Sequence, residues 1–386
     1  MTHKKTILVL TGGGITPALN ATLYGVITSA QKSGHTILGG ISGWKSVLQG
    51  GKHIDLSTVD VSSIQKIGGT ILRSSRTNLF AIENGVAQVK QTIANNNIDV
   101  IIAIGGDDTL GACERLVREH NIQAIGIPKT IDNDLYGTYW SPGYPSAASH
   151  VAHIAEHIRR DAAYALRRAF VIETYGMKSG WLTAAAGLGK ADVILTPERE
   201  VNTEHVLNTI YERYEANGSY AVIAVAENTQ FSDSVEGEEY DAADTFGHKR
   251  QNHISIALRR IIKKQLNIDS RVIMPGNIVQ SGEPTPIDGE TATALGRQAI
   301  AMIENEDYGH IPSIEVDQKN LAVTIGKRPL SEVVSHEGPR KIDDEMFDFA
   351  NYQVKPAFLE YLKPMQIHPH TPEEYIALQE KIRAIE

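Results

Sequence analysis

Two short runs of β-branched residues, Asp99–Ile104 and Ile122–Ile127, constrain the fold of this chain more than any other feature. The residues between them have the pattern of a helix, so the sequence predicts neighbouring parallel strands joined by a helix. Each strand ends in a polar turn, at Gly105–Thr109 and at Pro128–Asp134. Because ligands bind beyond the carboxyl ends of strands in an open α/β sheet, both turns are expected to face one site.

Together the two turns carry four aspartates, one lysine and a pair of glycines. In proteins, Mg²⁺ is held by one or two carboxylates together with substrate phosphate oxygens. A positioned carboxylate can also act as a general base. The composition of the two turns therefore suits a magnesium-bound phosphate beside a catalytic base.

Strands and helices alternate along the rest of the chain, which predicts parallel sheets covered by helices on both faces. One series begins with a strand at Thr6–Thr11 and a second with a strand at Ala169–Thr174. We therefore expect an α/β protein of two Rossmann-like three-layer lobes, with the active site in the cleft between them. The expected domains are residues 1–139 together with about 253–306, residues 140–252, and a C-terminal hairpin and helical extension at residues 307–386.

Several longer elements can also be placed from the pattern of apolar residues. The polar, acidic segment Thr229–Lys249 predicts a surface insertion, with a mobile lid as one interpretation. A hairpin is expected at Pro312–Val316 and Leu321–Ile325. Helices are expected at Ala81–Asn97, Ser146–Ala165, Glu204–Ala216, His253–Leu266 and Thr291–Ile303, and a last helical region from Asp343.

Length and composition place the chain among soluble globular proteins. Its 386 residues exceed one typical domain, and 41% hydrophobic and 22% charged residues are ordinary values. The net charge of −9 argues against a nucleic-acid partner, which favours a basic face. The N-terminus lacks a signal-peptide pattern, no apolar run approaches the length of a membrane helix, and the single cysteine, Cys113, favours a reducing compartment. We therefore expect a cytoplasmic protein without a membrane partner.

Two further segments suit an anion. The turn Gly12–Gly14 precedes a helix, whose free N–H groups and positive dipole end favour a phosphate. The chain lacks both the dinucleotide glycine fingerprint and the Walker loop, and a glycine turn can also serve only to reverse the chain. The loop Gly68–Thr77 carries two arginines among small residues. It is interpreted either as an anion-binding loop or as a solvated surface loop.

Taken in order, these motifs resemble those of the phosphofructokinase family, from residue 6 to about residue 305. Gly105–Thr109 resembles the nucleotide-side turn of the family, and Thr130–Asp134 matches its catalytic T-I-D-N-D letter for letter. Gly68–Arg76 resembles its GGT…SSR element, and Glu227 ends a segment that resembles its sugar-side acidic turn. The resemblance implies the phosphofructokinase-like fold and phosphoryl transfer to a sugar hydroxyl, in which the protein positions the reactants and neutralises charge.

The resemblance also implies a role for each matching residue. Asp132 would be the general base that takes the proton of the hydroxyl, a role worth about 10²–10⁴-fold in rate. Thr130 would line the transferred phosphoryl group, and Asp134 would orient the base or touch the metal. Asp107 would hold Mg²⁺, a role compatible with capping a helix. The other implied donor-binding residues are Gly13, Gly14, Arg76, Gly106, Asp108 and Thr109.

Two residues bear on the identity of the donor. Asp108 and Lys129 resemble the pyrophosphate-dependent branch, whereas ATP-using bacterial members usually have glycine at the position of Asp108. An aspartate where the α-phosphate of ATP would lie adds repulsion and bulk. Lys129, which we group with the catalytic residues, would place a point charge on the end of pyrophosphate. We predict pyrophosphate as the donor, with an ATP-dependent sugar kinase as the alternative.

The acceptor side departs from the family. Family members usually read M-G-R where this chain has Tyr175, Gly176 and Met177, and usually carry a His or Tyr and an arginine at the positions of Asn277 and Gln280. Each lost charge-assisted contact to a phosphate costs about 1.5–3 kcal/mol. The implied acceptor-binding residues are Arg168, Tyr175, Gly176, Met177, Glu227, Arg271, Asn277 and Gln280.

Two interpretations of the acceptor site remain open. Lys178, Arg168 and Arg271 rebuild the phosphate pocket for fructose 6-phosphate, or the acceptor is another sugar or polyol, including one without that phosphate. Arg168 and Arg271 match arginines that the family contributes across a subunit interface. The resemblance therefore implies a homodimer or homotetramer with shared active sites.

We predict a Mg²⁺- and pyrophosphate-dependent phosphotransferase acting on fructose 6-phosphate or a related sugar or polyol. A catalytically silent regulatory homologue is the alternative from another class of protein. The intact Asp107, Thr130, Asp132 and Asp134 argue against that alternative, because loss of catalysis would leave these residues free to change.

Overall fold

The computed structural model describes residues 4–165, 167–233, 239–240, 251–334, 336, 338–367, 377–378, 381–382 and 384. Most of the predicted insertion Thr229–Lys249 lies outside these residues. The described parts of Met1–Ala147 and Gln280–Arg340 form one unit, and those of Ala148–Ala242, Lys249–Val279 and Lys341–Glu386 form a second.

The first unit is built on a five-stranded sheet with the order β3-β2-β1-β4-β5. Neighbouring strands are parallel, except that the edge strand β3 runs antiparallel to β2. The first strand lies in the middle, and the chain adds β2 on one side and β4 on the other. This arrangement places a topological switch point at the carboxyl ends of β1 and β4. The strands are β1 (Thr6–Thr11), β2 (Thr36–Gly40), β3 (His53–Asp55), β4 (Val100–Gly105) and β5 (Ala124–Pro128).

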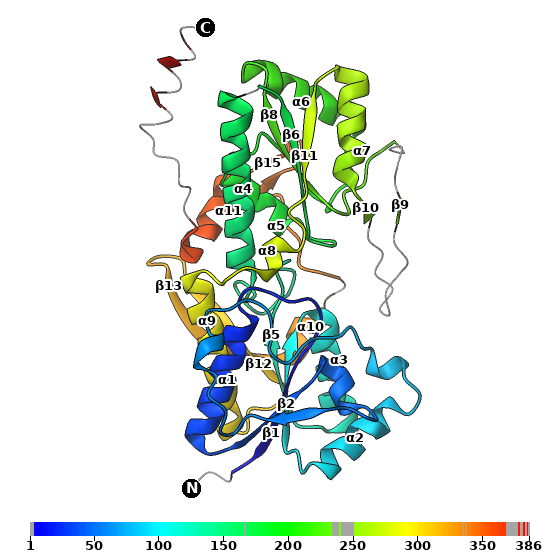
Figure 1. The fold of residues 1–386 in the computed structure, drawn as a ribbon, viewed down its shortest axis with the longest axis vertical. Helices are drawn as coiled ribbons and strands as arrows, with labels where there is room; N and C mark the ends of the chain where they lie inside the picture. Colours follow the sequence, from blue (N-terminus) through cyan, green and yellow to red (C-terminus); the bar gives the residue numbers. More distant parts are fainter. Residues whose placement is uncertain are drawn as a thin grey trace. The chain divides into compact units, whose positions relative to one another are not determined.

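Helices cover both faces of this sheet (Figure 1). On one side lie α2 (Gly85–Asn95) and α3 (Asp107–His120), whose apolar side chains share a buried core with alternate residues of β1 and β4 such as Leu8 and Ile101. On the other side, α1 (Leu19–Ser33) packs against α9 (Pro286–Glu304). A Cβ atom at Gly25 would overlap the backbone of α9, so only glycine permits this close approach.

The remaining elements of the first unit are short, apart from a hairpin that agrees with the predicted one. Its strands are longer than expected, because the antiparallel pairing extends from His310 opposite Pro329 to Asp317 opposite Ala322. The elements are the short helices η1 (Gly43–Val47), η2 (Ser62–Ile64) and η3 (Leu79–Ala81), the hairpin strands β12 (His310–Asp317) and β13 (Ala322–Pro329), and α10 (Leu330–Val334).

The second unit contains a four-stranded, wholly parallel sheet with the order β11-β6-β8-β7. Alternate strand residues, among them Val171 and Ile223, share a buried core with the apolar side chains of α6 and α7. The strands are β6 (Ala169–Thr174), β7 (Val193–Leu195), β8 (Ala221–Ala226) and β11 (Ser270–Ile273). The helices are α4 (Tyr144–Tyr164), α5 (Trp181–Ala184), η4 (Ala185–Gly187), α6 (Thr203–Ala216), α7 (Ile254–Ile261) with a π-helical turn at Ile262–Leu266, and α8 (Ile278–Ser281).

The C-terminal segment of the second unit differs from the predicted helical region that begins at Asp343. A small hairpin comes first, and the helix α11 starts only at Pro356, with proline in its favoured first turn. The elements of this segment are β14 (Phe347–Asp348), β15 (Gln353–Val354), α11 (Pro356–Leu362) and η6 (Lys363–Met365). The second unit also contains a separate strand pair from earlier in the chain, β9 (Glu239–Tyr240) and β10 (Gln251–Asn252).

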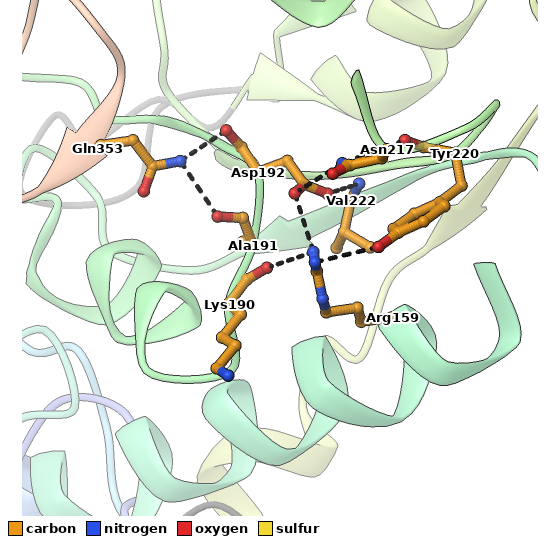
Figure 2. Close-up of polar contacts among 8 residues, drawn as sticks. All are labelled: Arg159, Lys190, Ala191, Asp192, Asn217, Tyr220, Val222 and Gln353. Atoms are coloured by element: carbon orange, nitrogen blue, oxygen red, sulfur yellow. Dashed lines mark hydrogen bonds and ion pairs between the residues drawn. The ribbon is translucent and has the colours of Figure 1, made fainter. Parts of the chain in front are cut away.

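A polar network around Asp192 fastens this C-terminal segment to the second sheet (Figure 2). One oxygen of the Asp192 carboxylate accepts hydrogen bonds from Arg159 Nη1 at 2.8 Å and Asn217 Nδ2 at 3.0 Å. The other oxygen accepts the N–H of Val222 at 2.8 Å. Gln353 donates from Nε2 to the carbonyl oxygen of Asp192. Helix α4, the sheet and β15 therefore meet at Asp192.

The two units divide the chain differently from the expected domains. Residues 253–279 were expected with the first sheet, but β11 pairs with β6 and so belongs to the second. The expected C-terminal extension is shared, because its hairpin belongs to the first unit and residues 341–367 belong to the second. Strand pairing between distant segments set these boundaries.

Within the described residues, no helix has both the length and the apolar character needed to cross a membrane.

Candidate active site

The glycine turn after β1 packs tightly against the start of α3. Gly12 donates its N–H to the carbonyl oxygen of Ile104 on β4, at 2.9 Å. A Cβ atom at Gly12 would overlap the side chain of Thr109, and Gly13 has φ +77°, a left-handed conformation that favours glycine. The turn that follows β1 and the turn that follows β4 therefore form one continuous surface at the switch point of the sheet.

The arginine-bearing loop is tied to this glycine turn by backbone and hydroxyl contacts. Gly13 donates its N–H to the carbonyl oxygen of Ser75 at 3.2 Å and accepts a hydrogen bond from Ser74 Oγ at 2.5 Å. Thr11 Oγ1 donates to the carbonyl oxygen of Arg73 at 2.7 Å. Arg76 is exposed, and its charge acts on the neighbouring Lys129. These contacts place the loop beside the glycine turn, and the anion-binding role of Arg76 stays a prediction.

Asn20 is a residue of this region that the sequence analysis missed. Its side chain is buried, and Nδ2 donates to the carbonyl oxygens of Ile67 and Gly68 while Oδ1 accepts the N–H of Ile71. The side chain thereby joins α1 to the arginine-bearing loop. A polar residue on the buried face of a helix, directly after a glycine turn, was the available signal.

Helix α3 begins within the turn that follows β4. Gly106 occupies the N-cap without a side-chain cap, so Asp107 and Asp108 lie in the first helical turn instead of capping it. Negative charge is favourable there because of the helix dipole. The carboxylate of Asp107 helps to raise the pKa of Asp134, so the carboxylates of the two predicted turns are electrostatic neighbours. Thr109 is buried behind them.

Lys129 belongs to the turn after β5, and its side chain reaches the glycine turn. It is only 2% exposed, and Nζ donates to the carbonyl oxygen of Gly14 at 2.6 Å. Burial, together with the charge of Arg76, lowers the pKa of its amino group from 10.5 to about 8, while Asp132 and Asp134 oppose the shift. A buried cation beside glycine backbone is suited to a phosphate.

The turn after β5 presents the predicted catalytic residues. The N–H of Asp132 donates to Thr130 Oγ1 at 3.1 Å, and the Asp132 side chain remains partly exposed. Asn133 is buried in a left-handed conformation with φ +55°. The pKa of Asp134 is raised first by desolvation and then by Asp107, while a hydrogen bond from Thr130 opposes the shift. The side chains of Asp132 and Asp134 are both partly exposed, and Asp132 is the predicted base.

Gln280 also belongs to this cluster, although the sequence analysis grouped it with the acceptor residues. Its Oε1 lies 3.8 Å from the position that a Cβ atom at Gly14 would take. Gln280 lies in the first unit, whereas the other predicted acceptor residues lie in the second. The backbone after it approaches so closely that a Cβ atom at Gly68 would overlap the carbonyl oxygen of Gly282.

In the second unit, five predicted acceptor residues gather at the carboxyl ends of β6, β8 and β11. Tyr175 donates from its hydroxyl to Asn277 Oδ1 at 3.2 Å. Met177 has φ +52° and donates its N–H to Glu227 Oε1 at 3.1 Å, with Glu227 itself buried. Gly176 has φ +149°, and a Cβ atom there would overlap the carbonyl oxygen of Ser179. The turn is therefore held in place by the carboxylate at the end of β8.

The two remaining predicted acceptor residues, Arg168 and Arg271, lie at the amino ends of the strands. Arg168 directly precedes β6, and Arg271 is paired with Phe170 near the start of that strand. With a rise of about 3.3 Å per residue, the six residues of β6 separate them from Tyr175 by roughly 20 Å. Within the second unit, the arginines therefore do not join Tyr175 and Glu227.

No group of three or more His, Cys, Asp or Glu residues that could hold a metal is present in the described part of the chain. The candidate site in the first unit offers instead Asp107 and Asp134, one from each turn. Such a set suits an ion that takes one or two carboxylates and completes its coordination with phosphate oxygens and water.

Comparisons with known proteins identify the family of this chain. The family model described as phosphofructokinase matches residues 6–303. A pyrophosphate–fructose 6-phosphate 1-phosphotransferase from Amycolatopsis mediterranei is 37% identical over 303 residues, which cover 78% of this chain and 88% of that protein. An ATP-dependent 6-phosphofructokinase from Halothermothrix orenii is 30% identical over 352 residues, 90% of this chain and 98% of that protein.

A solved structure shares the fold. The crystal structure of a pyrophosphate-dependent phosphofructokinase from Marinobacter aquaeolei matches with a TM-score of 0.82 at 24% identity, covering 95% of this chain and 92% of the other. The predicted α/β fold with two parallel sheets is confirmed. From the family match and the identity to its relatives, this chain is a member of the phosphofructokinase family.

Proposed function

We propose that this chain transfers a phosphoryl group from pyrophosphate to a sugar hydroxyl in a Mg²⁺-dependent reaction. The observation that carries the proposal is the buried Lys129, whose Nζ contacts the glycine turn at Gly14 between two carboxylate-bearing turns. Membership of the phosphofructokinase family supports the reaction class, a phosphotransferase with an alcohol group as acceptor. Relatives named as pyrophosphate-dependent support the donor.

The donor would lie against the glycine turn of the first unit. Gly13 and Gly14 would allow its phosphates to approach the backbone, and Lys129 and Arg76 would supply positive charge. Asp108, in the first turn of α3, disfavours a longer, more highly charged donor such as ATP by repulsion. These residues select a short donor with two phosphates.

Asp132 would take the proton of the acceptor hydroxyl, because its carboxylate is partly exposed and Asp134, the other aspartate of the turn, interacts with Asp107. Its backbone N–H contact to Thr130 fixes the geometry of the turn, and the Thr130 hydroxyl would line the transferred group. Asp134 and the buried Lys129 would set the local charge. Positioning and charge neutralisation are the main needs of phosphoryl transfer.

Asp107 would hold Mg²⁺, with Asp134 as the neighbouring carboxylate. Their mutual repulsion helps to raise the pKa of Asp134, and a divalent cation between them would relieve it. When bound at Asp107 and Asp134, Mg²⁺ would supply positive charge that neutralises the phosphate groups during transfer.

Two acceptors are compatible with the second unit. The relative from Amycolatopsis mediterranei carries fructose 6-phosphate in its name. In this chain, however, the strand ends that carry Tyr175, Met177 and Asn277 present a buried carboxylate, Glu227, and Lys178 follows Met177 in the chain. We propose that a single subunit, without arginines from a neighbouring copy, uses fructose 6-phosphate poorly. A related sugar or polyol with less negative charge is the second candidate.

Arg168 and Arg271 lie at the opposite edge of the sheet from Tyr175, so they cannot serve their own acceptor site. We propose that they complete the site of a neighbouring copy in a homodimer or homotetramer. Sedimentation of the purified protein, with and without Arg271→Ala, would detect the assembly and its dependence on this residue.

A donor and acceptor panel tests the proposal. The purified chain is assayed with pyrophosphate, ATP or ADP as donor, with Mg²⁺ or EDTA, and with fructose 6-phosphate, free sugars and polyols as acceptors. Turnover with pyrophosphate that EDTA abolishes, and that Asp132→Asn reduces by about 10²–10⁴-fold, is expected. Turnover with ATP alone would favour the ATP-dependent kinase. No turnover with any pair, or unchanged turnover in Asp132→Asn, would favour a silent homologue.

A further inference from the structure

A short segment after the catalytic turn, Ser141–Ser146, lies against that turn in the first unit. An isolated parallel bridge pairs Gly143 with Thr130, and the N–H of Ser141 donates to Asn133 Oδ1 at 3.1 Å. The predicted phosphoryl-lining residue is thus paired by its backbone to Gly143. The position of Thr130 depends on where this segment is held.

The same segment also touches Thr16, two residues after the glycine turn. Gly143 has φ +106°, and a Cβ atom there would collide with the side chain of Thr16. Any side chain at position 143 would therefore push the segment away from Thr16. Gly143 contacts both Thr130 and Thr16 and has no room for a side chain.

One fully buried carboxylate holds this segment in place. Asp288, 0% exposed in the first turn of α9, accepts the N–H of Gly143 at 3.0 and 3.2 Å through its two oxygens. It also accepts the N–H of Ser146 at 3.3 Å and the Ser146 hydroxyl at 2.5 Å. Ser146 Oγ in turn accepts the N–H of Thr285 at 3.0 Å. The carboxylate sits at the N-terminus of α4, where free N–H groups and the helix dipole favour a negative charge.

The burial of Asp288 argues that this contact is specific. Desolvation raises the pKa of its carboxyl to about 6, and the hydrogen bonds from Ser146 and Gly143 oppose the shift. Burying a charged carboxylate costs free energy, but an apolar residue at this position could not accept the N–H groups of Gly143 and Ser146. Through its contact with Gly143, the carboxylate also acts on the active site.

We infer that Asp288 is a positioning residue for the catalytic turn. It acts through Gly143 on Thr130 and, through Thr130, on Asp132 two residues further along the chain. It lies outside the reacting groups and touches neither donor nor acceptor. Its carboxylate fixes the strand position of Gly143, which fixes the backbone of Thr130. This inference rests on the proposed phosphoryl transfer only for its kinetic readout.

The main test is Asp288→Asn, which keeps the size of the side chain but turns one accepting oxygen into a donor facing N–H groups. We expect kcat to fall by about 10–100-fold, since a misplacement of about 1 Å can cost 10²-fold. The KM for pyrophosphate should stay within about threefold, because Lys129 and Gly14 are held by separate contacts. A kcat within twofold of the unmodified protein would overturn the inference.

Glu173→Gln is the matched control. Glu173 is also a carboxylate that accepts a backbone N–H and a hydroxyl, both from Ser255 at the start of α7, at 3.0 and 2.5 Å. It belongs to the second unit, whereas Gly143 belongs to the first. A purely structural role for Asp288 predicts that both variants lose stability and keep kcat, and that result would refute positioning.

Ser146→Ala covers the case in which Asp288→Asn does not fold. It removes the shortest contact to the carboxylate and the bond from the Thr285 N–H, but keeps the Asp288 carboxylate and its bonds to Gly143. We expect a fall in kcat of about threefold or more at unchanged KM, and an unchanged kcat would overturn the inference. Hydrogen exchange gives a readout without activity: peptides covering residues 130–146 should exchange faster in Ser146→Ala and Asp288→Asn, but not in Glu173→Gln. If the unmodified protein shows no transfer from pyrophosphate, the proposed function fails, while the exchange measurement still decides whether Asp288 holds the turn.

Discussion

Replacing Lys129 with methionine should separate the charge of this residue from its volume. Methionine fills a similar space but cannot donate to the Gly14 carbonyl or to a phosphate. A charge-assisted hydrogen bond contributes about 1.5–3 kcal/mol, and each 1.36 kcal/mol is tenfold in rate. We therefore expect kcat/KM for pyrophosphate to fall about 10–150-fold in Lys129→Met.

The same substitution should not destabilise the fold at neutral pH. Burial lowers the pKa of Lys129 from 10.5 to about 8, so its charged form costs about 3 kcal/mol in the folded state. The folded protein binds fewer protons than the unfolded one between pH 8 and 10.5, so this residue makes stability rise with pH in that window. Relative to Lys129→Met, the unmodified protein should gain stability between pH 7 and 10.5.

Steady-state kinetics and urea unfolding at several pH values test this reasoning. In the unmodified protein, kcat/KM for pyrophosphate should decline above about pH 8, because the neutral amine no longer attracts a phosphate. Lys129→Arg, which stays charged, should lack this decline and serves as the control. If Lys129→Met retains kcat/KM for pyrophosphate within a factor of three, Lys129 is not the donor-binding cation described above. A lower free energy of unfolding for Lys129→Met than for the unmodified protein at pH 7 would contradict the predicted cost of the buried charge.

Three further substitutions address the donor, the acceptor and the fold. Asp108→Gly should raise kcat/KM for ATP at least tenfold relative to pyrophosphate, since it removes the repulsive carboxylate; an unchanged donor ratio in competition assays would exclude this role. Met177→Arg should lower the KM for fructose 6-phosphate more than that for fructose, and equal effects on both would argue against a phosphate near this turn. Asp192→Ala removes the carboxylate that pairs with Arg159 and accepts the N–H of Val222. Because the side chains of Asp192 and Arg159 are only 10% and 27% exposed, urea unfolding should show a free energy of unfolding lower by about 2–4 kcal/mol. Asp344→Ala, which breaks the exposed ion pair to Arg199, is its control and should cost less than about 1 kcal/mol.

The strands were the most predictable part of this fold. The predicted limits of β1 and β6 agree with the structure residue for residue, because buried β-branched runs end abruptly at polar or glycine-rich turns. Helix limits shifted by a few residues, as at α2, where the predicted start at Ala81 is a separate 3₁₀ turn. The helix expected from Asp343 was wrong over its first part, where a hairpin packs Phe347 and Tyr352 into the core.

The candidate site was predictable in part. The residues of the two turns and the glycine turn were found from the sequence because each belongs to one contiguous motif, and the structure brings them together in the first unit. Asn20 and Asp288 were missed, since a buried polar residue inside an amphipathic helix shows its partner only in three dimensions. The positions of Gln280 and of Arg271 likewise depend on contacts with segments far away in the chain.

The sequence alone determined the local elements, the family and the chemistry of the turns, because strand propensity, glycine conformations and charged motifs act over a few neighbouring residues. The tertiary structure decided what the elements do for one another. It paired β11 with β6 and so moved residues 253–279 into the second unit, and it placed Arg168 and Arg271 at the edge opposite Tyr175. It also brought the carboxylate of Asp288 to Gly143, far from it in the chain. Such pairings arise from packing and hydrogen bonding between distant segments, which no short stretch of sequence encodes by itself.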